Sequence, residues 1–105
     1  MITVLTRFAV STAMDVSQVH IAFTLAAPAF RNLPDLIRKQ FLLTADGHPA
    51  GGVCLWNNDD VARRFVQECV APMIREIFQA EPSIEFYHSP VLVENDELQN
   101  FGANP

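Results

Sequence analysis

Histidine is the residue type in this chain best suited to acid–base chemistry, because the pKa of imidazole lies near neutral pH. His20 follows Val16 by four residues and precedes Phe23 by three, so on a helix it lies on or beside the apolar stripe. His88 falls in a β-type run, on the same face as Phe86. Either is a candidate catalytic base in an apolar cavity. The structural alternative is a hydrogen-bonded histidine at the edge of the core or, for His88, at a dimer seam.

Four further residues are candidates for contact with a small ligand. Phe23, Trp56 and Tyr87 are aromatic, and the last two each add one polar atom to an apolar surface. Lys39, like Arg7, is a charge inside a strand segment and could bind an anionic group. Each also has an ordinary structural role, because aromatic side chains fill cores and interfaces and long basic side chains usually reach water.

The chain carries no metal-binding or phosphate-binding motif. Its three histidines are far apart in the sequence, and His48 stands beside Pro49 in a turn, where we expect it to be exposed. Cys54 and Cys69 lie in apolar contexts and are expected to be buried, unpaired thiols. Gly51 opens a glycine pair at the start of a strand and not before a helix, which argues against a phosphate loop.

These candidates have to be positioned by four strands and two helices. Asp15 is the expected N-cap of the first helix, with Gln18 completing a capping box, and Asn57 or Asn58 should cap the second. The glycine pair at 51–52 indicates a bulge or a close backbone approach. The apolar spacing predicts strands over 2–10, 36–45, 51–57 and 83–93 and helices over 16–31 and from 58 to about 80.

Two prolines fall inside the predicted helices. Pro28 should kink the first helix or end it early, and Pro72 should break the second into two pieces, because proline lacks a backbone N–H. The second helix should bury Val66 and Cys69 on its inner stripe.

The order strand, helix, strand, strand, helix, strand predicts a ferredoxin-like α+β sandwich with a four-stranded antiparallel sheet and two helices on one face. The strands carry large apolar residues on both faces: in the second strand Leu36 and Leu42 oppose Ile37, Phe41 and Leu43. We therefore expect a homodimer through the uncovered sheet faces. Burying about 800 Å² per subunit corresponds to roughly 20 kcal/mol of gross driving force. The alternative is a monomer with an exposed apolar face.

Composition narrows the class of protein. A chain of 105 residues is one domain, which we place at 1–95, followed by a tail whose Leu98 and Phe101 could anchor on another surface. The net charge is −5 and the seven basic residues are scattered, so a nucleic-acid partner is not expected. No apolar run is long enough to span a membrane, and the first residues do not follow a signal-peptide layout, so we expect a cytoplasmic protein.

The chain resembles the dimeric α/β-barrel superfamily and, within it, small bacterial monooxygenase-like proteins. The likeness covers roughly residues 1–95, and it is carried by LIRKQF at 36–41, GGVCLW at 51–56, and the stretches 71–87 and 90–95. The resemblance implies a pocket in each subunit between sheet and helices. The superfamily includes cofactor-free oxygenases, haem-binding enzymes, isomerases and proteins with no known reaction.

The resemblance therefore implies a cofactor-independent monooxygenase-like protein that acts on a small aromatic or polyketide-like substrate. In such oxygenases the substrate is held deprotonated and reacts with oxygen directly. No stretch here matches the Asn, Trp and Tyr positions of those enzymes, so no catalytic residue is carried over. A non-catalytic small-ligand-binding or interaction protein of the same fold is the alternative. A haem-binding or haem-degrading protein is the third, because one histidine on a helix can hold haem.

Overall fold

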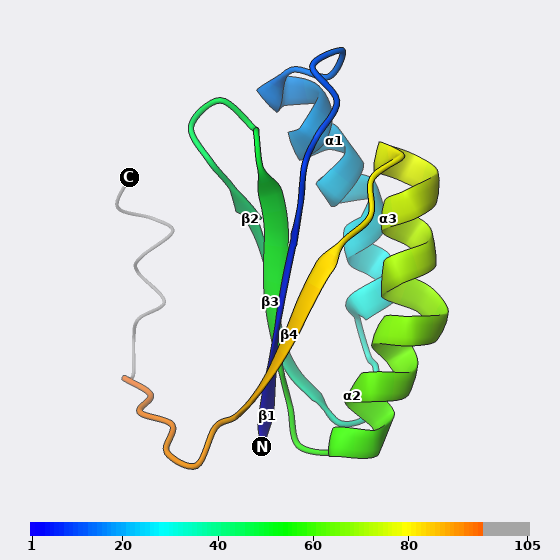
Figure 1. The fold of residues 1–105 in the computed structure, drawn as a ribbon. Helices are drawn as coiled ribbons and strands as arrows, with labels where there is room; N and C mark the ends of the chain where they lie inside the picture. The colour runs from blue at the N-terminus through cyan, green and yellow to red at the C-terminus, as the bar shows by residue number, and fades with distance from the viewer. Residues whose placement is uncertain (96–105) are drawn as a thin grey trace.

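The computed structural model describes residues 1–95 and shows a four-stranded sheet with its helices on one side (Figure 1). This confirms the predicted ferredoxin-like fold class. Leu98 and Phe101, the expected tail anchors, lie outside the described residues. The elements in chain order are β1 (Ile2–Phe8), α1 (Val16–Ala26), the 3-10 helix η1 (Ala27–Phe30), β2 (Leu36–Leu43), β3 (Ala50–Trp56), α2 (Asp59–Phe65), the π-helix η2 (Val66–Val70), α3 (Ala71–Phe78) and β4 (Ser83–His88).

All neighbouring strands are antiparallel, and their order across the sheet is β2-β3-β1-β4. In β1 the side chains of Ile2, Val4 and Phe8 are buried toward the helices, and Val10 just beyond the strand is buried as well. These four residues form the face that the apolar alternation predicts. Within the described residues, no helix is long and apolar enough to cross a membrane.

β2 contains an irregularity near its start that changes which residues share a face. Its register against β3 shifts after Leu36, so that Leu36 pairs with Trp56 while Lys39 pairs with Cys54. Leu36 therefore lies on the helix side together with Lys39, and not with Leu42 as predicted. The prediction was wrong because a bulge inserts one extra residue and inverts the alternation before it.

α1 begins with the predicted capping box. The Asp15 carboxylate accepts from the backbone N–H of Gln18 at 2.9 Å, and the Gln18 side-chain oxygen accepts from the N–H of Asp15 at 2.8 Å. The α-helix ends at Ala26 and continues as the short η1, which contains Pro28 in its first turn. The early end at this proline was predicted, because its ring fixes φ and removes a donor.

The second helix does not break at Pro72. Asn58 caps it, accepting from the N–H of Val61 at 3.0 Å, and the helical path then runs through α2, η2 and α3 to Phe78. A π-helical turn precedes the proline, with the N–H of Ala71 bonded to the carbonyl of Val66. The wider turn accommodates the missing donor without ending the helix, so the predicted break was wrong. It also exposes Cys69, which was expected to be buried.

Three predicted strands are longer than the observed ones. β1 and β2 each end two residues early, at Phe8 and Leu43, and β4 ends at His88 and not at residue 93. The backbone N–H of Ser89 still donates to the carbonyl of Met1 at 3.0 Å. The next residue, Pro90, has no N–H to donate, and the ladder stops there.

The core between sheet and helices is built largely from aromatic rings. Their centroids lie between 4.6 and 5.9 Å apart, in tilted and edge-on arrangements that favour aromatic pairs. The rings in contact are Phe8, Phe23, Phe30, Phe41, Trp56, Phe65 and Phe78.

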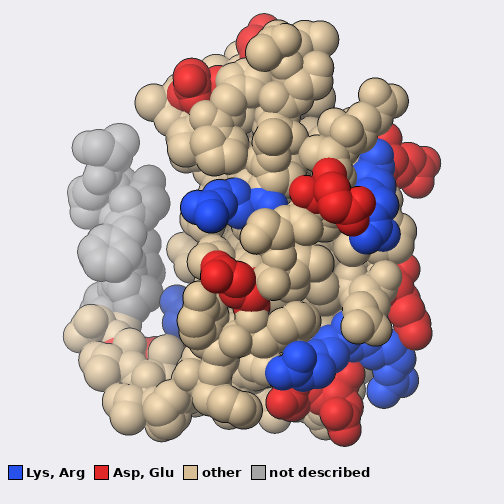
Figure 2. All heavy atoms as spheres, in the orientation of Figure 1, with Lys and Arg blue, Asp and Glu red and all other residues tan. Residues whose placement is uncertain are grey.

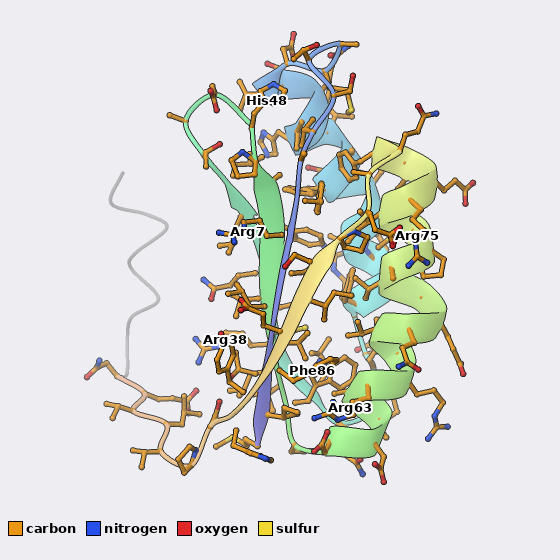
Figure 3. All side chains as sticks on the ribbon, viewed as in Figure 1. Arg7, Arg38, His48, Arg63, Arg75 and Phe86 are labelled. Carbon is orange, nitrogen blue, oxygen red and sulfur yellow. The ribbon has the colours of Figure 1, made fainter. Side chains whose placement is uncertain are left out.

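The other face of the sheet mixes apolar and charged side chains. Leu5 and Val53 are half-buried there and Leu42 is exposed, while Arg7 and Arg38 point away from the helices (Figure 3). In the view that shows β4 and α3, acidic and basic side chains lie next to one another and do not form a basic patch (Figure 2).

Candidate ligand-binding cavity

A cavity lies between the helix-facing side of the sheet and the helices α1, η1 and α3. It holds about 30 Å³ of free volume. This is far below the ~300–1,000 Å³ usual for small-molecule sites, so an aromatic ligand would enter only if the lining side chains moved apart. The lining is almost entirely apolar: Phe8, Ala22, Phe23, Ala26, Phe30, Phe41, Gly51, Val70, Met73, Ile74, Ile77 and Phe78, with the polar Thr6 and Lys39.

Among the described residues, Lys39 alone brings a charged group into this lining. Its ammonium nitrogen lies 4.6 Å from the ring centroid of Phe30 and 4.9 Å from that of Phe41. Both distances are within the range of a cation–π interaction. Among residues 1–95, no carboxylate lies within 4.0 Å of the ammonium and it has no hydrogen-bond acceptor. Aromatic faces are thus its principal stabilising contacts.

Gly52 explains how the lysine fits inside. It lies on β3 beside Phe41 of β2, and a Cβ placed on it would come within 2.6 Å of the Lys39 nitrogen. The ammonium therefore occupies space that any other residue at 52 would fill. At Gly51 an added Cβ would overlap the carbonyl oxygen of Thr6. The predicted close backbone approach is confirmed at Gly51.

Desolvation sets the acid–base behaviour of Lys39. Burial lowers the pKa of Lys39 below its ordinary value of 10.5, because apolar surroundings disfavour the charged form. Cys54, directly opposite on β3, acts in the other direction and has the smaller effect. An amine of this kind loses its proton more readily than a solvated lysine and can accept one from a bound acid.

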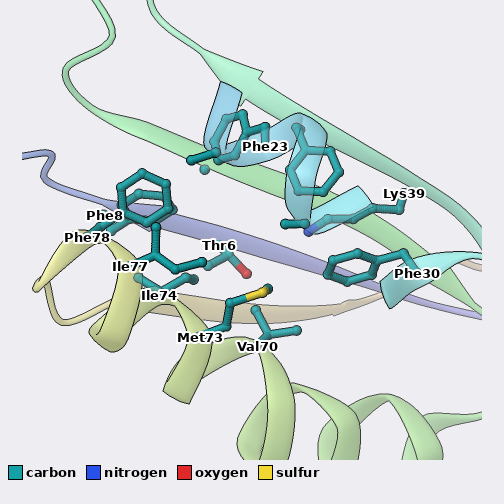
Figure 4. A pocket seen from close by; sticks show the side chains of 14 residues that line it. Thr6, Phe8, Phe23, Phe30, Lys39, Val70, Met73, Ile74, Ile77 and Phe78 are labelled. Carbon is teal, nitrogen blue, oxygen red and sulfur yellow. The ribbon is translucent and has the colours of Figure 1, made fainter. Parts of the chain in front are cut away.

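Thr6 is the second polar group of the cavity. It is 3% exposed and lies on β1, opposite Gly52. Figure 4 shows Thr6 and Lys39 reaching into the cavity from the sheet, with Met73 and Ile77 closing it from α3. Ile77 is 41% exposed, so the cavity opens to solvent beside this residue.

Neither candidate base reaches this space. His20 is exposed on α1, one residue beyond the buried Val19, and His88 is exposed at the end of β4. Neither lines the cavity. His48 is half-buried and not exposed as expected, because its Nδ1 lies 3.0 Å from the carbonyl oxygen of Val10.

The aromatic and charged candidates divide into two groups. Phe23 and Lys39 line the cavity as expected. Trp56 is 1% exposed and packs against Phe65 with ring centroids 5.5 Å apart, outside the cavity. Tyr87 is 51% exposed and pairs with Thr3 on the open face, where the neighbouring Glu85 raises the pKa of Tyr87.

Sequence reasoning gave Lys39 no more weight than the other candidates, although one signal was present. It is the only lysine in the chain, and the other six basic residues are arginines. Lysine is usually exposed, so a half-buried lysine in an apolar cavity is unusual.

The residues present do not fit haem. The side chains that most often bind haem iron are those of His, Cys, Met and Tyr. Of these types only Met73 lines the cavity, and neither His20 nor His88 reaches it. No group of three His, Cys, Asp or Glu side chains suited to a metal ion occurs within residues 1–95.

Comparisons with known proteins identify the fold. No family model matches the chain, and no curated protein matches it. A proposed antibiotic biosynthesis monooxygenase from Deinococcus radiodurans superposes with a TM-score of 0.71 at 11% identity, over 90% of this chain and 98% of that one. SnoaB, a cofactor-independent oxygenase from Streptomyces nogalater, gives 0.66 at 16%, over 90% and 97%.

The same fold also occurs in a protein that binds a porphyrin. A variant of MhuD, solved with two manganese protoporphyrin IX molecules per active site, matches with a TM-score of 0.68 at 14% identity, over 90% of this chain and all of that one. At these identities the likeness shows the fold alone. The chain therefore has the β-α-β-β-α-β fold shared by cofactor-independent oxygenases and haem-binding proteins.

Proposed function

We propose that this protein binds a small aromatic compound with an acidic hydroxyl group in the Lys39 cavity and oxidises it as a cofactor-independent monooxygenase. The observation that carries the proposal is an ammonium group among phenylalanine rings without a carboxylate partner in residues 1–95. Lys39 is half-buried, and a partly desolvated charge is costly unless it is paired. An anionic ligand would supply the missing partner.

The chemistry of the lining indicates what kind of acid fits. Phe23, Phe30 and Phe41 offer ring faces and edges for an aromatic ligand. A phenol or enol with a hydroxyl group near Lys39 can pass its proton to the amine, which leaves an ammonium–phenolate pair in an apolar environment. The low dielectric of the site strengthens the attraction between the two charges. The deprotonated form of such a compound is also the form that reacts with oxygen.

The overall reaction on this proposal is balanced without a cofactor. A ring methylene of an anthrone-type substrate loses two hydrogens, one oxygen atom of O₂ forms the new carbonyl and the other leaves as water. The substrate supplies the electrons, and Lys39 holds the hydroxyl proton. Helix α3 and the phenylalanines limit water in the site, which strengthens the ion pair.

Oxygen uptake with anthrone-type and quinol-type compounds tests this function. Wild-type protein should consume oxygen and form the corresponding quinone. Lys39→Met should abolish the activity, while His20→Ala and His88→Ala should retain it. Uptake that depends on either histidine and not on Lys39 would contradict the proposed site.

The rival function is non-catalytic binding of the same class of ligand. It shares the cavity and the ion pair, and it predicts a ligand-dependent rise in melting temperature that Lys39→Met removes. Binding without oxygen uptake for any anthrone or quinol would favour this rival over the oxygenase.

A homodimer through the open sheet faces belongs to the same proposal. A groove of about 250 Å³ runs over Gly51 on this face, lined in part by Leu5, Arg7 and Leu42. Leu5 is half-buried and Leu42 is exposed there, and a second copy would cover them. The two unpaired thiols suit a reducing compartment, so cytoplasmic location remains part of the proposal.

A further inference from the structure

Lys39 differs from a typical counter-ion site in one respect. Arginine keeps its charge in almost any environment, and lysine does not. The chain uses arginine for every other basic position and lysine only where the side chain enters the apolar cavity. A site that needed positive charge alone would be served by arginine. The amine is therefore the chemically distinctive feature of this position.

The surroundings of the nitrogen leave it available for reaction. Among the described residues no carboxylate or hydrogen-bond acceptor holds it. The absence of a side chain at Gly52 makes room for the amine itself, and Thr6 lies in the same cavity. Desolvation of the amine lowers its pKa, which increases the fraction in the neutral, nucleophilic form near pH 7.

We infer that Lys39 forms an imine with the carbonyl carbon of an aromatic aldehyde or ketone bound in this cavity. The amine lone pair attacks the carbonyl carbon and gives a carbinolamine, and loss of water then yields the C=N bond. One C–N double bond forms, the C=O bond breaks, and two protons leave the nitrogen with the oxygen. No oxidant or reductant is involved.

Residues around Lys39 could contact both the ring of the aldehyde and the oxygen of the carbinolamine. The ring of the aldehyde would pack against Phe23, Phe30 and Phe41 once these side chains move apart, because they are in contact with one another in the free protein. Thr6, 3% exposed and inside the cavity, offers a hydroxyl group that can donate to the carbinolamine oxygen. The apolar lining limits the water that would hydrolyse the imine.

Reductive trapping tests the inference on the whole protein. The native chain is incubated near pH 7 with 4-hydroxybenzaldehyde and sodium cyanoborohydride, and the modified positions are mapped by peptide mass spectrometry. The chain has only one lysine, so the α-amino group at residue 1 is its only other aliphatic amine and serves as an internal reference. We expect modification at Lys39 to be severalfold faster in the folded protein than in protein unfolded in urea, because desolvation lowers its pKa.

Variants separate reactivity from simple access. Lys39→Arg should remove the adduct at this position and leave the α-amino reaction unchanged. Thr6→Val should slow the Lys39 adduct only. Two results on the wild-type protein would overturn the inference, whether or not the variants fold. One is labelling of the α-amino group alone, and the other is slower labelling of Lys39 in the folded than in the unfolded protein.

The inference goes beyond the proposed oxidation and can fail separately. Imine formation needs no oxygen, and oxygen uptake needs no aldehyde. A protein that consumes oxygen with anthrones and gives no trapped adduct would retain the proposed function and lose the imine. A trapped adduct without oxygen uptake would give the opposite result.

Discussion

Lys39 and Gly52 lie on neighbouring strands, and the lysine ammonium occupies the space that a side chain at position 52 would need. An added Cβ at Gly52 would be 2.6 Å from the nitrogen and 3.1 Å from the carbonyl oxygen of Gln40. The first contact is with the end of a flexible side chain. The glycine thus determines where the amine sits more than whether the sheet forms.

The two adjacent glycines provide a matched pair for this relationship. Gly52→Ala should displace the Lys39 nitrogen and weaken binding of acidic aromatic ligands while the protein remains folded. Gly51→Ala should lower the free energy of unfolding by about 1–3 kcal/mol, because its Cβ meets the backbone of Thr6, which cannot move aside. Urea unfolding and ligand titration on both variants measure the difference. Equal destabilisation with unchanged ligand binding would contradict this role for Gly52.

Replacement of Lys39 should also change the stability of the protein. The partial burial of Lys39 without a carboxylate partner in residues 1–95 costs free energy, so Lys39→Met should raise the free energy of unfolding at pH 7 by about 1 kcal/mol. If Lys39 had a purely structural role, Lys39→Met would instead lower the free energy of unfolding. Urea denaturation of the two proteins checks the sign.

The pH dependence of that difference follows from the lowered pKa. Between the folded-state pKa of Lys39 and 10.5, the unfolded chain binds more protons than the folded one, so wild-type stability rises with pH relative to Lys39→Met. The advantage of the methionine variant should be complete below the folded-state pKa and shrink as the pH approaches 10.5. A constant difference from pH 7 to 10 would show that the amine is not desolvated.

The aromatic ring of Phe30 should affect the pKa of Lys39. Its centroid is 4.6 Å from the ammonium, and this contact favours the charged form. Phe30→Leu should therefore lower the pKa of Lys39 further and move the pH profile of reductive labelling to lower pH. Phe78→Leu is the matched control, because Phe78 lines the same cavity without a cation–π contact to Lys39 in the structure. An unchanged pH profile of labelling in both variants would show that the Phe30 ring does not affect the pKa of Lys39.

The fold could be predicted because its signals are local. Alternation in β1, the capping box at Asp15 and the turn before β3 each depend on residues close in sequence. Errors occurred where one residue changes the geometry. The bulge in β2 moved Leu36 to the other face, and the π-helical turn carried the helix past Pro72.

The cavity was harder to predict because it depends on helix phase and strand register together. Val19 and Phe23 are both buried on α1, which rotates the neighbouring His20 by about 100° to the exposed side. Lys39 becomes a site residue only because β3 places Gly52 beside it. This contact joins positions thirteen residues apart and depends on the strand register. A single lysine within an apolar strand was the one local signal.

The open face of the sheet gives the last prediction. Leu42 lies on this face and is 40% exposed, and it borders the groove over Gly51. If a second copy covers the groove, Leu42→Asp places a charge in the interface and should convert the protein to monomers of 11.7 kDa in sedimentation experiments at micromolar concentration. Leu25→Asp is the control, because Leu25 is 76% exposed on α1, away from the open face. A wild-type protein that sediments as a monomer, or dissociation by Leu25→Asp alone, would contradict a dimer formed through the sheets.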